Sequence, residues 1–109
     1  MLKFYIMIET IKAIFGMGPK VDFARLVAEG AIIVDVRSKG EFQGGHIRQA
    51  INIPLQNIEG HLKQLPKDRV IITCCASGMR SASAANMLKN KGYKEVYNGG
   101  GWQSLQSKM

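Results

Sequence analysis

A chain of 109 residues with 46% hydrophobic and 21% charged side chains has the composition of one globular domain, which excludes a disordered chain. Its formal net charge of +7 favours anionic partners. The basic residues are scattered, with no dense run and no interleaved aromatic residues, so we expect a small anion rather than a nucleic acid. The two cysteines are adjacent and cannot close a disulfide loop, which argues against a secreted scaffold and predicts a reducing, cytoplasmic location.

The N-terminus resembles a signal or membrane segment only at first sight. Charged side chains interrupt residues 1–17, and the stretch is shorter than the ~20 residues that a membrane span needs. Its apolar residues recur at helical spacing: Phe4, Ile8, Ile11 and Phe15. We therefore expect an amphipathic helix within residues 1–18, of open role, that packs on the domain at 19–109 rather than on a membrane.

The first half of the domain contains clear start and stop signals. Asp22 is an expected N-cap for a helix that ends before Gly30. The run "AIIVDV" (31–36) predicts a strand that is buried on both faces. Ser38 and Glu41 have the spacing of a capping box, which predicts a short helix that ends at the next glycine pair.

The second half continues the alternation of strands and helices. We expect a short strand at 50–54, a helical face over 58–65, a buried strand at 70–74, a helix over 81–92, and a last strand that leads through glycines to a helix with Trp102 and Leu105. This alternation predicts an α/β sandwich with a parallel sheet and helices on both faces. In such sheets the ligand site lies at the carboxyl ends of the strands, where Asp35 and Cys75 are expected.

The segment "CCASGMRS" (74–81) links a predicted strand to a predicted helix. A turn this tight directs successive backbone N–H groups into one concavity, and Gly78 allows a positive φ within it. The helix N-terminus and the Arg80 guanidinium add positive charge. The sequence therefore predicts an anion-binding cradle whose first residue is a thiol.

Such a cradle would favour the thiolate of Cys75. Lowering a thiol pKa by two units takes about 2.7 kcal/mol. A helix dipole supplies only ~0.3–1 kcal/mol, so the loop N–H groups, at ~1.5–3 kcal/mol each, are expected to contribute most. Because neighbouring strand residues point to opposite faces, Cys74 is expected to be inert core filler. The alternative is that Cys74 acts as a resolving thiol.

Three stretches then resemble a known family. The segments "IIVDVRSKGEFQGGHIRQAINIP", "VIITCCASGMRSASAANMLKNKGYKEVYNGG" and "GWQSL" are similar to single-domain rhodaneses, which are thiosulfate-type sulfurtransferases. The likeness covers roughly residues 20–106. It implies a three-layer sandwich with a five-stranded parallel sheet flanked by helices. Two departures are Arg48-Gln49, where the family often has Pro-Gly, and Cys74, where an aromatic or aliphatic residue is usual.

The resemblance also implies the site and its chemistry. Cys75 would accept sulfur as a persulfide, and Arg80 would steer a small anionic donor such as thiosulfate. A thiol or a sulfur-carrier protein would be the acceptor, with no metal and no cofactor. The residues expected to form the persulfide-binding loop are Ala76, Ser77, Gly78, Met79 and Ser81, and those expected to support it are Asp35, Arg37 and Arg48.

Several alternatives stay open. Related phosphatases and arsenate reductases have a loop one residue longer than the four residues between Cys75 and Arg80, which favours sulfur transfer here. A relay module without turnover and a redox-regulatory domain are the other two readings. Ser81 either caps the helix or contacts the persulfide, His46 is expected to bond a turn rather than a metal, and Trp102 is expected in the core.

Overall fold

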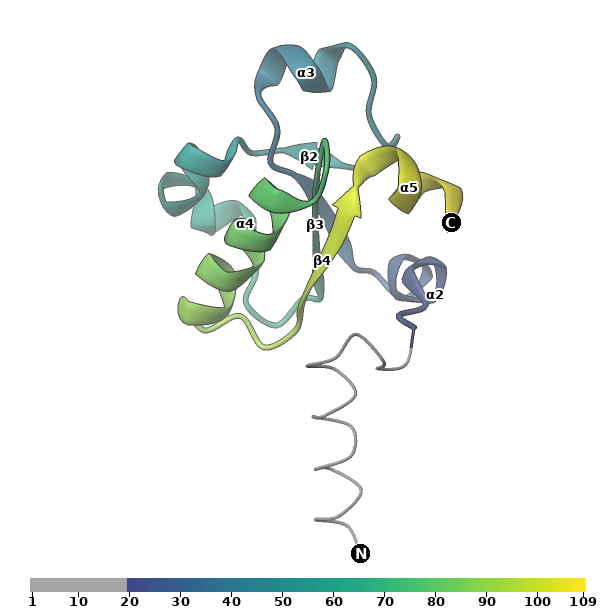
Figure 1. Ribbon diagram of the computed structural model, residues 1–109. Helices are drawn as coiled ribbons and strands as arrows, with labels where there is room; N and C mark the ends of the chain where they lie inside the picture. The colour runs from purple at the N-terminus through teal and green to yellow at the C-terminus, as the bar shows by residue number, and fades with distance from the viewer. Residues whose placement is uncertain (1–19) are drawn as a thin grey trace, which may run out of the picture.

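The computed structural model describes residues 20–109 (Figure 1). The helix expected within residues 1–18 lies outside the described residues. The elements, in chain order, are α2 (Phe23–Ala28), β1 (Ile32–Asp35), α3 (Lys39–Gln43), β2 (Ile51–Asn52), the 3-10 helix η1 (Leu55–Gln64), β3 (Ile71–Cys75), α4 (Met79–Asn90), β4 (Val96–Gly101) and α5 (Trp102–Ser107).

The strands form one parallel sheet in the order β2-β1-β3-β4. The resemblance implied five strands, whereas residues 20–109 form four. The segment ahead of β1 is the helix predicted from Asp22, whose side chain accepts a hydrogen bond from the Arg25 N–H at 3.1 Å. Because all four strands run the same way, their carboxyl ends meet at one edge, where Asp35 pairs in register with Cys74.

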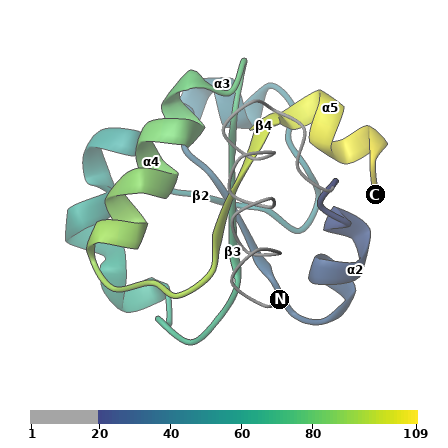
Figure 2. The same ribbon diagram turned by 60° about the horizontal axis from the view of Figure 1, so that its bottom comes forward.

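Helices cover both faces of the sheet. In Figures 1 and 2, α4 and η1 lie on one side of it, and α2 and α5 lie on the other. Each face has its own apolar cluster. The first includes Val34, Ile58, Ile71, Ala84 and Leu88, and the second includes Phe23, Ile33, Ile47, Ile72 and Leu105. The predicted α/β sandwich is therefore confirmed, with the core divided into two layers by the sheet.

The predicted helix boundaries follow from local chemistry. Ser38 and Glu41 form the expected capping box of α3, with the Ser38 N–H donating to Glu41 Oε1 at 3.0 Å and the Glu41 N–H donating to Ser38 Oγ at 3.2 Å. The helical face expected over 58–65 is a 3-10 helix that is kinked at His61. It still buries Ile58 and brings the buried Leu65 to its end.

The glycines of β4 allow this strand to approach the end of β3 closely. A Cβ atom on Gly99 would lie 2.8 Å from the carbonyl oxygen of Thr73, closer than packed atoms allow. The β3–β4 register also shifts, because Thr73 pairs with Asn98 but Cys75 pairs with Gly101. Such a bulge redirects the strand locally, here beside the loop that follows β3.

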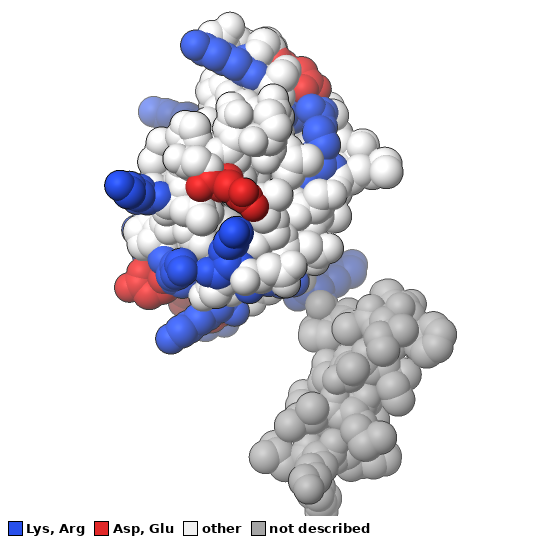
Figure 3. All heavy atoms as spheres, turned by 90° about the vertical axis from the view of Figure 1, so that its left-hand side faces the viewer, with Lys and Arg blue, Asp and Glu red and all other residues white. Residues whose placement is uncertain are grey.

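The basic side chains are distributed over the surface. In Figure 3 they are spread over the face that α4 and η1 cover and are interleaved with acidic side chains. Within residues 20–109, no helix is long and apolar enough to cross a membrane.

Candidate active site

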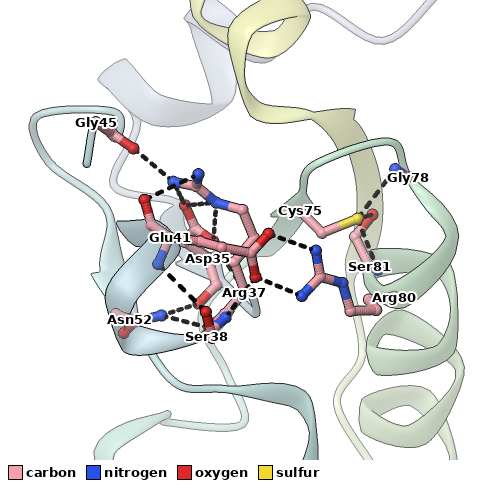
Figure 4. Close-up of polar contacts among 10 residues, drawn as sticks. All are labelled: Asp35, Arg37, Ser38, Glu41, Gly45, Asn52, Cys75, Gly78, Arg80 and Ser81. Carbon is pink, nitrogen blue, oxygen red and sulfur yellow. Dashed lines mark hydrogen bonds and ion pairs between the residues drawn. The ribbon is translucent and has the colours of Figure 1, made fainter. Parts of the chain in front are cut away.

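The sulfur of Cys75 lies at the base of the predicted cradle. The Gly78 N–H donates to Sγ at 3.0 Å, and the Ser81 N–H donates to it at 3.4 Å. The hydroxyl oxygen of Ser81 is also 3.4 Å from the sulfur. Gly78 adopts φ +103° as the N-cap of α4, and this turns its N–H toward Sγ. The loop therefore surrounds one sulfur atom with hydrogen-bonding groups (Figure 4).

These contacts favour the thiolate. Burial opposes ionisation and is the largest single influence on Cys75, which is 1% exposed. Hydrogen bonds from the Ser81 side chain and from the N–H groups of the loop outweigh it and lower the Cys75 pKa. Among these favourable contacts the Ser81 side chain contributes most. The N–H groups of Ser81, Gly78 and Ser77 follow as three further contributions, so the hydroxyl that the first turn of α4 brings to the sulfur adds to the N–H groups expected from the sequence.

Cys74 faces the opposite side of the sheet, as predicted. It is fully buried among the residues between the sheet and helices α2 and α5. Burial, followed by the negative charge of Asp35, raises the pKa of Cys74 to about 12. This thiol therefore stays protonated at neutral pH and lies away from the cradle, as a small apolar side chain does.

A buried ion pair braces the strand end beside the cradle. Asp35, 0% exposed, receives hydrogen bonds from Arg37 at its backbone N–H (3.0 Å), at Nε (3.0 Å) and at Nη2 (2.8 Å). Arg37 Nη2 also donates to the Gly45 carbonyl at 2.7 Å, and its guanidinium lies 4.9 Å from the centre of the Trp102 ring. The amide of Asn52 donates to the carbonyls of both residues of the pair, at 2.9 Å. Asp35 and Arg37 therefore act as scaffold, linking β1 to the α3 loop and to α5.

Arg80 is held by a carboxylate rather than left free. Its Nη1 lies 2.7 Å from Glu41 Oε1, and its Nη2 lies 3.0 Å from Glu41 Oε2. The side chains of both residues are more than one third exposed. The Arg80 guanidinium, first among the groups around it, lowers the pKa of Glu41 to about 2, so the carboxylate is charged at all ordinary pH values. An anion that binds Arg80 must therefore compete with Glu41.

The family of the chain follows from its sequence over this whole region. The rhodanese-like domain family matches residues 20–108. The chain belongs to this family.

Individual relatives of this rhodanese-like chain are consistent with the family match. A sulfurtransferase of Allochromatium vinosum is 36% identical over 64% of the chain, and a putative sulfur carrier protein of Bacillus subtilis, YrkF, is 37% identical over 64%. These matches cover 65% and 38% of the two relatives, so the chain matches less than two thirds of their lengths. Among solved structures, the human single-domain sulfurtransferase TSTD1 has a TM-score of 0.73 and 25% identity, over 84% of this chain and 98% of that one.

Not every residue expected at this rhodanese-like site reaches the sulfur. Gly78 and Ser81 donate hydrogen bonds to it, and the backbone of Ser77 helps to lower its pKa, whereas Ala76 is exposed and Met79 is 79% exposed at the rim. Arg48 is exposed on the loop before β2. His46 bonds the Phe42 carbonyl at 2.7 Å, as expected, and the expected core residue Trp102 is only half-buried.

Two residues were missed in the sequence. Glu41 was assigned only to the capping box, although its second carboxylate oxygen meets Arg80. The sequence does not single out Asn98, whose Oδ1 accepts a hydrogen bond from the Ser81 hydroxyl at 2.6 Å. The available signal for Asn98 was its position just before the three glycines of β4, at the carboxyl edge of the sheet.

Proposed function

We propose that the protein is a sulfurtransferase that carries sulfur on Cys75 as a persulfide. The observation that supports this most directly is the set of hydrogen-bonding groups around Sγ, which lowers the thiol pKa. Within residues 20–109, no histidine or lysine is among the groups that lower it. A thiolate is the nucleophile that attack on sulfur requires. The family and the relatives named above support the same class of reaction.

In the first half-reaction the Cys75 thiolate attacks the outer sulfur of thiosulfate or of a similar donor. A new S–S bond forms to Sγ while the S–S bond of thiosulfate breaks, and its electron pair leaves with sulfite. In the second half-reaction a thiolate acceptor, or cyanide in an assay, attacks the outer sulfur. The Cys75 thiolate is released, so no external oxidant or reductant is consumed.

The cradle residues would have separate tasks in this reaction. The N–H groups of Gly78 and Ser81 stabilise the Cys75 thiolate when it forms and again when it leaves. Arg80 attracts an anionic donor to the mouth of the loop by exchanging the Glu41 carboxylate for the anionic group of the donor. The acceptor would be a small thiol or a sulfur-carrier protein.

The deciding experiment measures persulfide formation directly. The protein is treated with thiosulfate, and the Cys75 peptide is examined by mass spectrometry for the gain of one sulfur atom. We expect this gain in the wild type and in Cys74→Ala, whose side chain faces the other side of the sheet, and not in Cys75→Ser. A Cys75→Ser protein that still transfers sulfur from thiosulfate to cyanide would rule out the mechanism.

A steady-state assay with thiosulfate and cyanide then distinguishes an enzyme from the two alternative hypotheses, a relay module and a redox-regulatory domain. An enzyme turns over with both small molecules. A relay module accepts sulfur on Cys75 from a protein donor but turns over thiosulfate poorly. A redox-regulatory domain forms no persulfide, although Cys75 is oxidised reversibly.

A further inference from the structure

Asn98 of β4 is an exposed residue that makes three hydrogen bonds, two of them to residues of the cradle. Its Oδ1 accepts from the Ser81 hydroxyl at 2.6 Å and from the Gly100 N–H at 2.9 Å. Its Nδ2 donates to the Gly78 carbonyl at 3.3 Å. Asn98 therefore contacts two of the residues whose N–H groups donate to the sulfur of Cys75, and its own three hydrogen bonds go to other atoms.

The orientation of the Asn98 amide is determined by its neighbours. With oxygen and nitrogen exchanged, the NH₂ group would face the N–H of Gly100, and the oxygen would face the carbonyl of Gly78. Both contacts would bring like partial charges together. The Asn98 oxygen can therefore only accept from Ser81, and the hydroxyl of Ser81 must donate to it.

The Ser81 hydroxyl has one proton and two possible acceptors. While Cys75 is a thiol, its S–H donates to Ser81 Oγ, and the hydroxyl donates to Asn98 Oδ1, so each proton has a partner. When Cys75 loses its proton to water, the sulfur can only accept. The hydroxyl then has to leave Asn98 to stabilise the thiolate.

This exchange leaves the Asn98 oxygen with a partner. When the hydroxyl turns to the sulfur, Asn98 Oδ1 keeps the hydrogen bond from the Gly100 N–H. Asn98 is exposed, so its oxygen keeps this second donor and stays open to water after the hydroxyl has turned away. Gly100 lies within the register shift between β3 and β4, between Asn98, which pairs with Thr73, and Gly101, which pairs with Cys75.

We propose that Asn98 is a positioning residue that holds the Ser81 hydroxyl proton away from the Cys75 thiol and yields it to the sulfur on ionisation. The inference rests on the proposed function only in taking Cys75 as the nucleophile. The proton of the thiol goes to solvent, and the hydroxyl keeps its own proton and changes only its acceptor. Asn98 thereby acts on Cys75 through Ser81.

The charged groups around Cys75 do not take over the role of Asn98 in holding the Ser81 hydroxyl proton. On β3 its neighbour is the thiol Cys74, and on β1 the charges are the closed pair Asp35–Arg37. Arg80 on α4 is paired with Glu41 on α3. Strand β4 adds Tyr97, which packs with the cluster on the opposite face, and α5 carries no ionisable side chain.

The test is a double-mutant cycle with the Cys75 pKa as its readout, taken from the pH dependence of iodoacetamide alkylation. We expect Asn98→Ala to lower the Cys75 pKa when Ser81 is present, and to lower it less in the Ser81→Ala background. The difference should be about one half to one unit, the equivalent of one neutral hydrogen bond. The exposed Asn86 of α4 provides the control, since Asn86→Ala should leave the alkylation profile unchanged.

Asn98→Asp gives a second and independent cycle if Asn98→Ala fails to fold. Its carboxylate accepts the hydroxyl proton more strongly, so the difference between the two backgrounds should have the opposite sign. Equal shifts in both backgrounds would overturn the inference, because they would mean that Asn98 acts only through the loop or through its charge. Alkylation requires no sulfur transfer, so this result stands apart from any failure of the proposed function.

Discussion

Glu41 of α3 and Arg80 of α4 are joined by two hydrogen bonds, 2.7 and 3.0 Å long, although 39 residues separate them in the sequence. The pair links the helix after β1 to the first turn of the helix that follows the cysteine loop (Figure 4). The Glu41 carboxylate also pairs with the Arg80 guanidinium, which the proposed reaction needs in order to attract an anionic donor. The pair is therefore expected to affect donor binding more than the stability of the fold.

Glu41→Gln should lower the KM for thiosulfate about two- to fivefold, the range expected for one exposed ion pair. Glutamine can still cap α3, so the substitution removes the charge and keeps the helix start. Steady-state kinetics with thiosulfate as the varied substrate measure the effect. Glu29→Gln, which breaks the exposed pair with Arg25, is the matched control and should not change KM. An unchanged KM in both variants would contradict a role for Arg80 in donor binding.

Native protein treated with iodoacetamide at neutral pH should take up one label, on Cys75. The Cys75 pKa is lowered, so alkylation should reach half its maximal rate below the pH found for a free cysteine. The Cys74 pKa, near 12, should keep that thiol protonated and unreactive until the chain is unfolded in denaturant. Peptide mapping by mass spectrometry distinguishes the two sites, and early labelling of Cys74 would contradict the assignment.

The buried Cys74 thiol should make the protein less stable at alkaline pH. Its pKa is raised in the folded state, so its contribution is complete below the unfolded value of ~8.5 and is lost as the pH rises toward 12. Between pH 9 and 10 the free energy of unfolding should fall by about 1.2 kcal/mol more in the wild type than in Cys74→Ala. Urea unfolding with a reductant present measures both slopes. If the free energy of unfolding falls equally with pH in both proteins, Cys74 ionises as easily in the folded protein as in the unfolded one.

Gly78→Ala should loosen the cradle. Gly78 has φ +103°, which strains any residue with a Cβ, although the added Cβ would make only an ordinary contact of 3.4 Å with the Cα of Gly100. We expect a loss of about 1–2 kcal/mol in the free energy of unfolding, and a higher Cys75 pKa as the N–H leaves the sulfur. Gly60→Ala is the control, because no atom lies within 4 Å of its added Cβ. Equal stabilities of the two variants in urea would contradict this account.

Removing the guanidinium of Arg37 should be far more damaging than removing an exposed one. Arg37→Met leaves the buried carboxylate of Asp35 without its charged partner, which typically costs about 3–5 kcal/mol. Arg25→Met, which breaks the exposed pair with Glu29, should cost less than about 1 kcal/mol. Thermal and urea unfolding measure both losses. Similar losses in the two variants would show that Asp35 is stabilised by other groups.

Local features of the sequence were sufficient for most of the fold. The unbroken apolar run before the cysteines predicted a strand buried on both faces, and β3 is buried at every position. The same alternation of side chains along a strand predicted that Cys74 and Cys75 lie on opposite faces, and they belong to different clusters. These inferences succeed because strand geometry and helix capping depend on residues only a few positions apart.

The number of strands could not be obtained in this way. The resemblance implied five, but residues 20–109 form four. The chain ahead of β1 contains the Asp22 cap and folds as α2. A strand requires a partner edge as well as a suitable sequence, and only the complete sheet decides which edges are available.

The sequence alone determined a thiol at the end of a buried strand, a glycine that turns the loop back, and the face to which each cysteine points, because these follow from short-range backbone geometry. Only the tertiary structure decided that Glu41 would occupy Arg80 and that Asn98 would compete with the sulfur for the Ser81 hydroxyl. Both contacts join segments that come together at the carboxyl edge of the sheet. Their geometry depends on the packing of α3 beside α4 and on the register shift of β4, which local patterns do not specify.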